Sequence, residues 1–109
     1  MDSFTAAKIL KDENPEHYQA LKEYPVVFHY RRGDHHRRYE RRTIEEDGRN
    51  EYLRINYAPP FQGPSLLSPA HAARFYPAFA AFEKILARED MTYRVRLNDG
   101  DLVIFNNRR

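Results

Sequence analysis

The last nineteen residues, 91–109, constrain the fold more than any other stretch, because they read as a β-hairpin. Residues 91–97 alternate apolar and polar side chains, which is the period-two pattern of a strand with one buried face. Asp99 and Gly100 then form a dipeptide typical of a tight turn. The apolar run Leu102–Phe105 is typical of a strand that is covered on both faces. We therefore expect this hairpin to join a larger β-core.

Three helices are predicted from start signals. A first short helix is expected through residues 6–10, with Ser3 or Thr5 as its cap. Asn14 followed by Pro15 is a clearer start, for a second helix that runs to about Glu23.

Ser68 followed by Pro69 predicts the longest helix in the same way. Pro77 lies inside it and is expected to bend the helix or to mark where it restarts. We expect this helix to cover the sheet that the final hairpin joins. Its apolar stripe at helical spacing indicates core packing and consists of Phe75, Phe79, Phe82 and Leu86, widened by Ala72 and Ile85.

The middle of the chain is predicted to be β-structure. In the last of its strands, Leu53, Ile55 and Tyr57 are expected to face the core. The proline-rich segment 59–64 is expected to be a loop without ladder or helix. The expected order is a strand at 24–32, a polar connection at 31–38, a strand from about 39 to 45, a turn at Asp47-Gly48 and a strand at 51–57.

The segment Leu97–Arg109 resembles part of the TauD/TfdA-like iron(II)/2-oxoglutarate dioxygenases, in particular their γ-butyrobetaine and trimethyllysine dioxygenase branch. In that branch a Gly-Asp turn leads into an apolar strand, an Asn-x-Arg segment and then the distal metal-binding histidine. Arg54–Asn56 and the stretch from Phe75 to Asp101 fit the same pattern. The resemblance covers essentially the whole chain.

The resemblance implies an α+β fold, a partial double-stranded β-helix (jelly roll) with one long covering helix and short N-terminal helices. Residues 1–109 would be the middle-to-late part of the dioxygenase domain, truncated at both ends. The full family domain would use iron(II) and 2-oxoglutarate to hydroxylate a small substrate of the γ-butyrobetaine or trimethyllysine kind. We expect this chain alone to bind neither cofactor.

The catalytic residues of such a family are missing from the sequence. The family begins its metal site with His-x-Asp or His-x-Glu, and none of the five histidines occurs in that pattern. By the family spacing, the distal histidine would fall three residues beyond Arg109, and the arginine that binds 2-oxoglutarate would lie further on. We therefore assign no catalytic and no metal-binding residue, and we expect the chain alone to be inactive.

Two polar clusters offer other interpretations. His29, Asp34, His35 and His36 could form a substitute metal site, but neighbouring arginines would repel a divalent cation, so a solvated loop is favoured. The span 31–54 holds eight arginines, which raises the alternative of a small basic RNA-binding domain. Six carboxylates in the same span favour cross-strand Arg–Glu pairs on a solvated face, with no nucleic-acid partner.

Two asparagines are candidates for the wall of a substrate pocket. In the butyrobetaine branch, asparagines help hold the substrate's carboxylate. They lie near the end of the strand that corresponds to residues 53–57, and Asn56 lies in that neighbourhood. The chain then departs from the family at Ala58-Pro59-Pro60. Asn107 precedes the position of the distal ligand and is expected to shape the turn there. Both asparagines also fit an ordinary role at a strand end or turn.

Composition limits the remaining classes. Eighteen basic and sixteen acidic side chains leave a net charge of +2, too small to indicate a polyanionic partner. The chain has no cysteine and no apolar run long enough to span a membrane, so we expect an intracellular protein, cytoplasmic or mitochondrial, without membrane contact. The alternative to a dioxygenase segment is a non-catalytic truncated paralogue that associates through unpaired strand edges.

Overall fold

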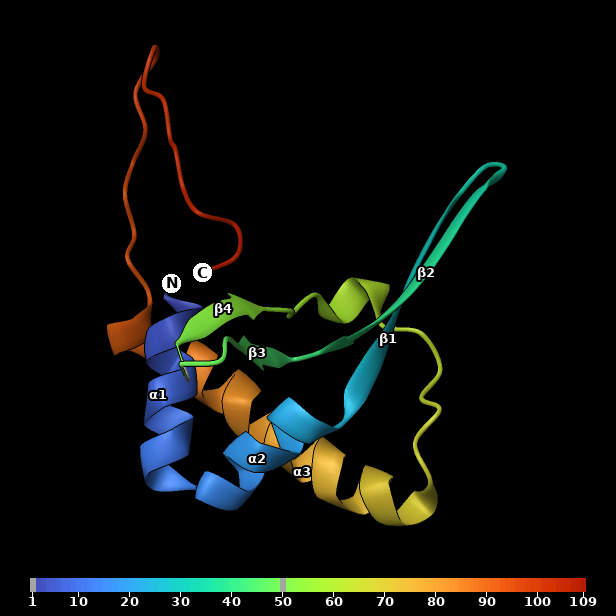
Figure 1. The fold of residues 1–109 in the computed structure, drawn as a ribbon. Helices are drawn as coiled ribbons and strands as arrows, with labels where there is room; N and C mark the ends of the chain where they lie inside the picture. Colours follow the sequence, from blue (N-terminus) through green and yellow to red (C-terminus); the bar gives the residue numbers. More distant parts are fainter. Residues whose placement is uncertain (1, 50) are drawn as a thin grey trace.

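The structure, a computed structural model, describes residues 2–49 and 51–109, in which three α-helices form a layer beside two small antiparallel sheets (Figure 1). One sheet pairs β1 with β2, and the other pairs β3 with β4. The expected mixture of helix and sheet is confirmed. The strands are arranged as two separate pairs, so the sheet structure is only partial.

Helix α1 spans Ser3–Glu13, and its cap differs from the one predicted. The Asp2 carboxylate accepts hydrogen bonds from the backbone N–H groups of Phe4 at 3.1 Å and Thr5 at 3.3 Å. Neither Ser3 nor Thr5 is the cap, because Asp2 already satisfies these N–H groups from one position earlier.

The caps of the other two helices are confirmed. Helix α2 spans Pro15–Glu23, and the Asn14 side chain accepts from the backbone N–H of His17 at 3.0 Å. Helix α3 spans Pro69–Leu86 and is capped by Ser68. In both helices a proline occupies the first position, where its missing N–H has no intrahelical partner to lose.

Helix α3 supplies much of the core but does not cover the segment expected to form the final hairpin. It packs against α1 and α2 instead. The helix continues through Pro77. The predicted apolar stripe is largely buried, with Ala78 added at the same face. The buried residues of the helix are Phe75, Ala78, Phe82, Ile85 and Leu86.

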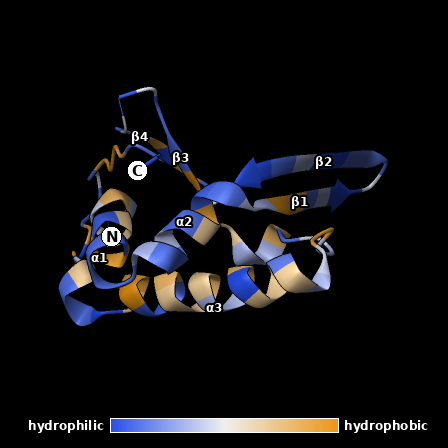
Figure 2. Ribbon diagram, turned by 60° about the horizontal axis from the view of Figure 1, so that its bottom comes forward, coloured by the Kyte–Doolittle hydropathy of each residue, from blue (hydrophilic) through white to orange (hydrophobic). Residues whose placement is uncertain are grey.

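Strands β1, Pro25–Arg32, and β2, His35–Arg42, form a long ribbon that projects from the helices (Figure 1). The expected polar connection at 31–38 is wrong, because only Gly33 and Asp34 form the turn. Gly33 has φ 54°, a value that lets the chain reverse within two residues. The second strand therefore begins at His35 rather than near Tyr39. Strand β2 is exposed and hydrophilic along its length (Figure 2).

Strands β3, Ile44–Glu46, and β4, Tyr52–Ile55, pair around the predicted turn at 47–48. Ile55 is buried as expected, but Leu53 is 50% exposed. A register irregularity between Glu45 and Glu46 explains this outcome, because the pairing skips Leu53. Such a bulge reverses the face that a side chain would take in a regular strand.

Residues 92–105 form an extended excursion from the fold, here called the apolar arm (Figure 1). Its predicted turn is present, with Gly100 at φ 92° and the Asp101 N–H donating to the Asn98 carbonyl at 3.1 Å. The predicted hairpin is wrong, because residues 92–105 form no strand ladder with one another or with the rest of the described chain. The apolar run is also uncovered. The exposed arm side chains are Tyr93, Val95, Leu97, Leu102, Val103, Ile104 and Phe105.

The chain returns to the fold after the arm. The Ile55 N–H donates to the carbonyl of Arg108 at 3.0 Å, and the Ser3 N–H donates to the carbonyl of Arg109 at 2.9 Å. The Arg109 guanidinium also pairs with Asp2 at 2.7 Å. These contacts place residues 106–109 beside the end of β4.

The proline-rich segment is less irregular than predicted. Pro59–Phe61 forms a single 3₁₀ turn, η1, and Gln62 makes an isolated bridge to Phe28 of β1. The Gly63 N–H donates to the carbonyl of Val27 at 2.9 Å. The two prolines cannot donate to a ladder, but the residues that follow them can. A second 3₁₀ turn, η2, spans Glu89–Met91 and leads into the apolar arm.

Candidate functional site

A cleft of about 490 Å³ lies where the ribbon, the end of β4 and the returning C-terminal segment meet. Its volume is within the range of small-molecule sites. Among the described residues its lining is mainly aromatic, apolar and amide, with one cation and no carboxylate. The residues that line it are Phe28, Tyr39, Arg41, Ile55, Asn56, Tyr57, Ala58 and Asn107.

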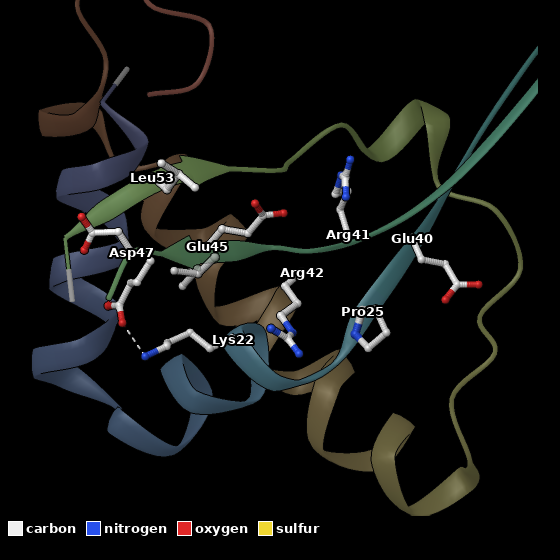
Figure 3. A pocket seen from close by; sticks show the side chains of 10 residues that line it. Lys22, Pro25, Glu40, Arg41, Arg42, Glu45, Asp47 and Leu53 are labelled. Carbon is white, nitrogen blue, oxygen red and sulfur yellow. Dashed lines mark hydrogen bonds and ion pairs between the residues drawn. The ribbon is translucent and has the colours of Figure 1, made fainter. Parts of the chain in front are cut away.

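The ribbon contributes three side chains from one of its faces. Phe28 of β1 lies directly opposite Tyr39 of β2 in the antiparallel register. Arg41 is two residues further along β2 and therefore shares the face of Tyr39. Figure 3 shows Arg41 and Arg42 extending to opposite sides of β2. The strand alternation thus brings Arg41 to the cleft and turns Arg42 away from it.

Tyr57 is held in place by helix α3. Its ring stacks on Phe79 with centroids 5.4 Å apart and meets Phe82 edge-on at 5.9 Å. Its hydroxyl donates to the Glu83 carboxylate at 3.2 Å. Burial raises the pKa of Tyr57, and the nearby negative charge of Glu83 raises it further. The tyrosine therefore stays neutral and provides a fixed aromatic wall.

The two asparagines predicted for the pocket wall line this same cleft. Asn56 is already engaged, because its side-chain amide donates to the Arg42 carbonyl at 2.8 Å and to Glu45 Oε1 at 2.9 Å. The Asn107 side chain forms no hydrogen bond within the described residues. Its position follows from the neighbouring contact between Ile55 and Arg108. The geometry brings the pair together without assigning either a role.

A second hollow, of about 580 Å³, lies beside β2, β3 and helix α2 and is lined mainly by charged side chains (Figure 3). Arg41 lines both hollows. Glu46 is its best-anchored group, with a side chain only 4% exposed that accepts hydrogen bonds from Lys22 and from Tyr18. Burial raises the pKa of Glu46, but the hydrogen bonds from Lys22 and Tyr18 outweigh it and hold the pKa below its usual value. This network fastens β3 to helix α2.

The histidines do not assemble into a metal site. Within the described residues, no group of three His, Asp or Glu side chains is placed to hold a metal ion. His29 lies opposite Arg38 in the ribbon, and His36 lies opposite Arg31. His35 lies on the other face of β2 from His36, because neighbouring residues of a strand alternate. Arginines therefore lie beside these histidines in the structure, and their positive charge would repel a divalent cation, as the sequence indicated.

The arginine-rich span is divided between the two sheets. Six of its eight arginines lie in the ribbon with two carboxylates, Asp34 and Glu40, whereas the other four carboxylates belong to the β3–β4 region. One cross-strand pair of the expected kind joins Arg54 to Glu45 at 3.6 Å. Another pair, Arg38 with Glu40 at 3.6 Å, lies along a single strand.

No helix in the part of the chain that the structure describes combines the length and apolarity needed to cross a membrane.

Comparison with known proteins defines the class. The family model described as "Taurine catabolism dioxygenase TauD, TfdA family" matches residues 1–109. The chain is also 35% identical over 108 residues to dioxygenase str8 of Strobilurus tenacellus, an alignment that covers 99% of this chain and 25% of that protein. The chain belongs to the TauD/TfdA family, and it spans about a quarter of the length of this relative.

Both asparagines suggested by the sequence lie in the lining of this cleft, whereas the sequence did not point to Arg41, Tyr39 or Phe28. The signal for these three was the register of the ribbon, because Phe28 pairs with Tyr39 and Arg41 follows at the next position on the same face. Because residues 31–38 were predicted to be a loop, the pairing of β1 with β2 was not predicted.

Proposed function

We propose that this chain forms part of an iron(II)/2-oxoglutarate-dependent dioxygenase domain with a double-stranded β-helix fold, and that its cleft is one wall of the substrate site. The observation that carries this proposal is the convergence of Asn56 and Asn107 in one cleft within a TauD/TfdA family chain. The name of the relative from Strobilurus tenacellus, a dioxygenase, supports the reaction class.

The 109 residues do not fit an iron site by themselves. A facial triad needs two imidazoles and a carboxylate on one face, and the described histidines are separated or placed opposite arginines. We therefore assign the metal ligands and the 2-oxoglutarate-binding arginine to parts of the parent polypeptide outside these residues.

The substrate in this proposal is a small molecule of the kind handled by the γ-butyrobetaine and trimethyllysine dioxygenase branch, bearing a carboxylate or a quaternary ammonium group. The aromatic walls formed by Tyr57, Phe28 and Tyr39 suit an apolar or cationic body. Ala58 and Pro59 replace a position where the family can carry asparagine, which argues for a substrate other than γ-butyrobetaine itself.

Anaerobic titration with iron(II) and 2-oxoglutarate tests this proposal. The 109-residue chain is expected to show no metal-to-ligand charge-transfer absorption. A polypeptide extended on both sides, to supply His-x-Asp and the distal histidine, is expected to show the absorption and to convert 2-oxoglutarate to succinate.

A metal bound by the ribbon would give a different result. If the 109-residue chain gave the absorption, and substitution of His35 and His36 by alanine abolished it, the proposal would be wrong. A variant at His71, which stacks on Tyr24 with centroids 4.7 Å apart and lies outside the ribbon, is the matched control.

A further inference from the structure

We propose that the outer edge of strand β2 binds an extended, acidic segment of a partner protein, which adds to the ribbon as a third strand. Arg37 and Arg38 are the residues that select the carboxylates of this segment. Neither residue lines the cleft, so the inference is independent of the proposed function. Both lie in the outer part of the ribbon, which projects from the helices (Figure 1).

Positive charge is concentrated in the ribbon. Its six arginines and two carboxylates, Asp34 and Glu40, give residues 25–42 a net charge of +4 with the histidines neutral. The other twelve basic and fourteen acidic side chains of the chain give a net charge of −2. The overall charge of +2 is therefore the sum of a cationic projection and an acidic body, and the projection alone suits an acidic partner.

The arginines in the outer half of the ribbon have no carboxylate opposite them. Two of these arginines lie on each face, because neighbouring residues of a strand alternate. Arg38 approaches Glu40 along its own strand at 3.6 Å, but both side chains are more than half exposed and such a pair is weak. These guanidinium groups are therefore available to carboxylates of a partner. The cross-strand pairs are Arg31 with His36, Arg32 with His35, Arg37 with Tyr30, and Arg38 with His29.

The outer edge of β2 also offers backbone groups. The two-residue turn makes Arg32 and His35 the first hydrogen-bonded pair of the hairpin, so alternate residues direct their N–H and C=O groups away from β1. The outer edge of β1 is partly occupied, because the Val27 carbonyl accepts from the Gly63 N–H at 2.9 Å. The edge of β2 is therefore the one at which a strand can be added. Its outward groups, which have no backbone partner within the described residues, belong to His36, Arg38 and Glu40.

A segment with two adjacent carboxylates fits this edge. Residues directly opposite each other on paired strands share a face of the sheet. An adjacent pair of glutamates on the added strand therefore places one carboxylate beside Arg37 and the other beside Arg38, on opposite faces. Arg41 and Arg42 repeat the pattern four residues on, but their charge is offset by the carboxylates of the adjoining hollow, which are Glu40, Glu45, Glu46 and Asp47.

The same features fit a nucleic acid less well. Proteins that bind single strands combine one positively charged groove with aromatic rings on which bases stack. The outer arginines of this ribbon are divided between two faces, and the ring of Tyr30 already packs against Phe61 with centroids 5.9 Å apart. A nucleic acid also lacks the alternating amide groups that pair with a strand edge. The observations therefore favour a polypeptide partner.

Fluorescence anisotropy of labelled probes with the 109-residue chain, at ~0.15 M salt, tests the inference. The acidic probe is a peptide of three Glu-Glu-Thr-Thr repeats. One control has Gln-Gln-Thr-Thr repeats, and another is the acidic peptide with its two central threonines replaced by proline, which cannot complete a ladder. A thymidine heptanucleotide carries the same number of negative charges. We expect the acidic peptide to bind about tenfold more tightly than each of the others, as for two exposed ion pairs on a paired backbone.

Double variants assign the preference to the ribbon. With Arg37→Gln and Arg38→Gln together, the acidic peptide should bind about as weakly as the glutamine peptide. Arg94→Gln with Arg96→Gln is the matched control, because it removes the same charge from exposed positions of another extended segment, the apolar arm. It should keep the tenfold preference. All four side chains are exposed, and circular dichroism should show an unchanged fold in both double variants.

Four results would overturn the inference. Equal binding of the acidic and glutamine peptides would show that no charge selects the partner. Equal binding of the proline-containing peptide would show general attraction without strand addition. Equal loss in the two double variants would exclude the ribbon as the site. Tighter binding of the heptanucleotide than of the acidic peptide would show that the partner is a nucleic acid.

Discussion

Asn56 donates a hydrogen bond from its side-chain amide to Oε1 of Glu45 at 2.9 Å, which links the residue after β4 to the middle of β3. The same amide donates to the carbonyl of Arg42, and the backbone N–H of Asn56 donates to the carbonyl of Thr43 at 2.8 Å. One residue therefore connects the end of β4 to both sides of the break between β2 and β3. Asn56 therefore lines the cleft and also stabilises the β3–β4 sheet.

Removal of the Asn56 amide should weaken the fold. We expect Asn56→Ala to lower the free energy of unfolding by about 1–3 kcal/mol, because two acceptors lose their partner. Asn107→Ala is the control, since its side chain lines the same cleft without a hydrogen bond among the described residues. Urea unfolding at low protein concentration measures both. Equal destabilisation by the two variants would contradict the structural role of Asn56.

Acid should weaken the contact between helix α2 and β3. The pKa of Glu46 lies below its usual value in the folded chain, so its ionised form favours folding. That contribution is complete above the ordinary glutamate pKa of 4.5 and is lost as the pH falls through the lower, folded-state pKa. The free energy of unfolding should therefore decrease with falling pH in this range.

Two variants isolate this effect. Glu46→Gln should flatten the acid dependence and lower stability at neutral pH, because Lys22 and Tyr18 lose a charged acceptor. Glu40→Gln, at an exposed position of the ribbon, should keep the acid dependence of the unmodified chain. Urea unfolding from acidic to neutral pH gives the comparison. An unchanged slope in Glu46→Gln would exclude this carboxylate as the cause.

The apolar arm should make the isolated chain associate. Its exposed side chains include Ile104, 87% exposed, and Leu102, 82% exposed, on an extended backbone without ladder partners in the described structure. Such segments pair and pack with other chains. Ile104→Lys should shift the chain toward monomer in sedimentation velocity. Leu66→Lys adds the same charge at an exposed position outside the arm and should have little effect. A monodisperse monomer of the unmodified chain in the same sedimentation experiment would contradict this expectation.

A side chain added at Gly63 should push the loop after η1 away from β1. A Cβ there would lie 3.2 Å from the Cβ of His29 and 3.2 Å from a methyl carbon of Val27. We expect Gly63→Ala to cost about 1–3 kcal/mol, because the loop must move off β1. Hydrogen exchange of the amide at position 63 should accelerate, since it donates to the Val27 carbonyl. Gly48→Ala, where nothing lies within 4 Å, is the control and should leave that exchange rate unchanged.

Local signals in the sequence determined most of the helical elements and turns. Asn14-Pro15 and Ser68-Pro69 set two helix starts, because a side-chain acceptor and a proline at the first position act within a few residues. The Asp99-Gly100 turn also formed where predicted. Only tertiary structure decided which faces were covered. Leu53 is exposed because a bulge skips it in the pairing.

The arm and the cleft depend on partners that are distant in sequence. The run from Leu102 to Phe105 stays exposed. Apolar side chains favour burial, but their sequence does not determine which surface will cover them. Asn107 reaches the cleft through the hydrogen bond between Arg108 and Ile55, and Arg41 reaches it through the register of the ribbon. The sequence thus determined which side chains were available, while long-range backbone pairing decided which of them meet.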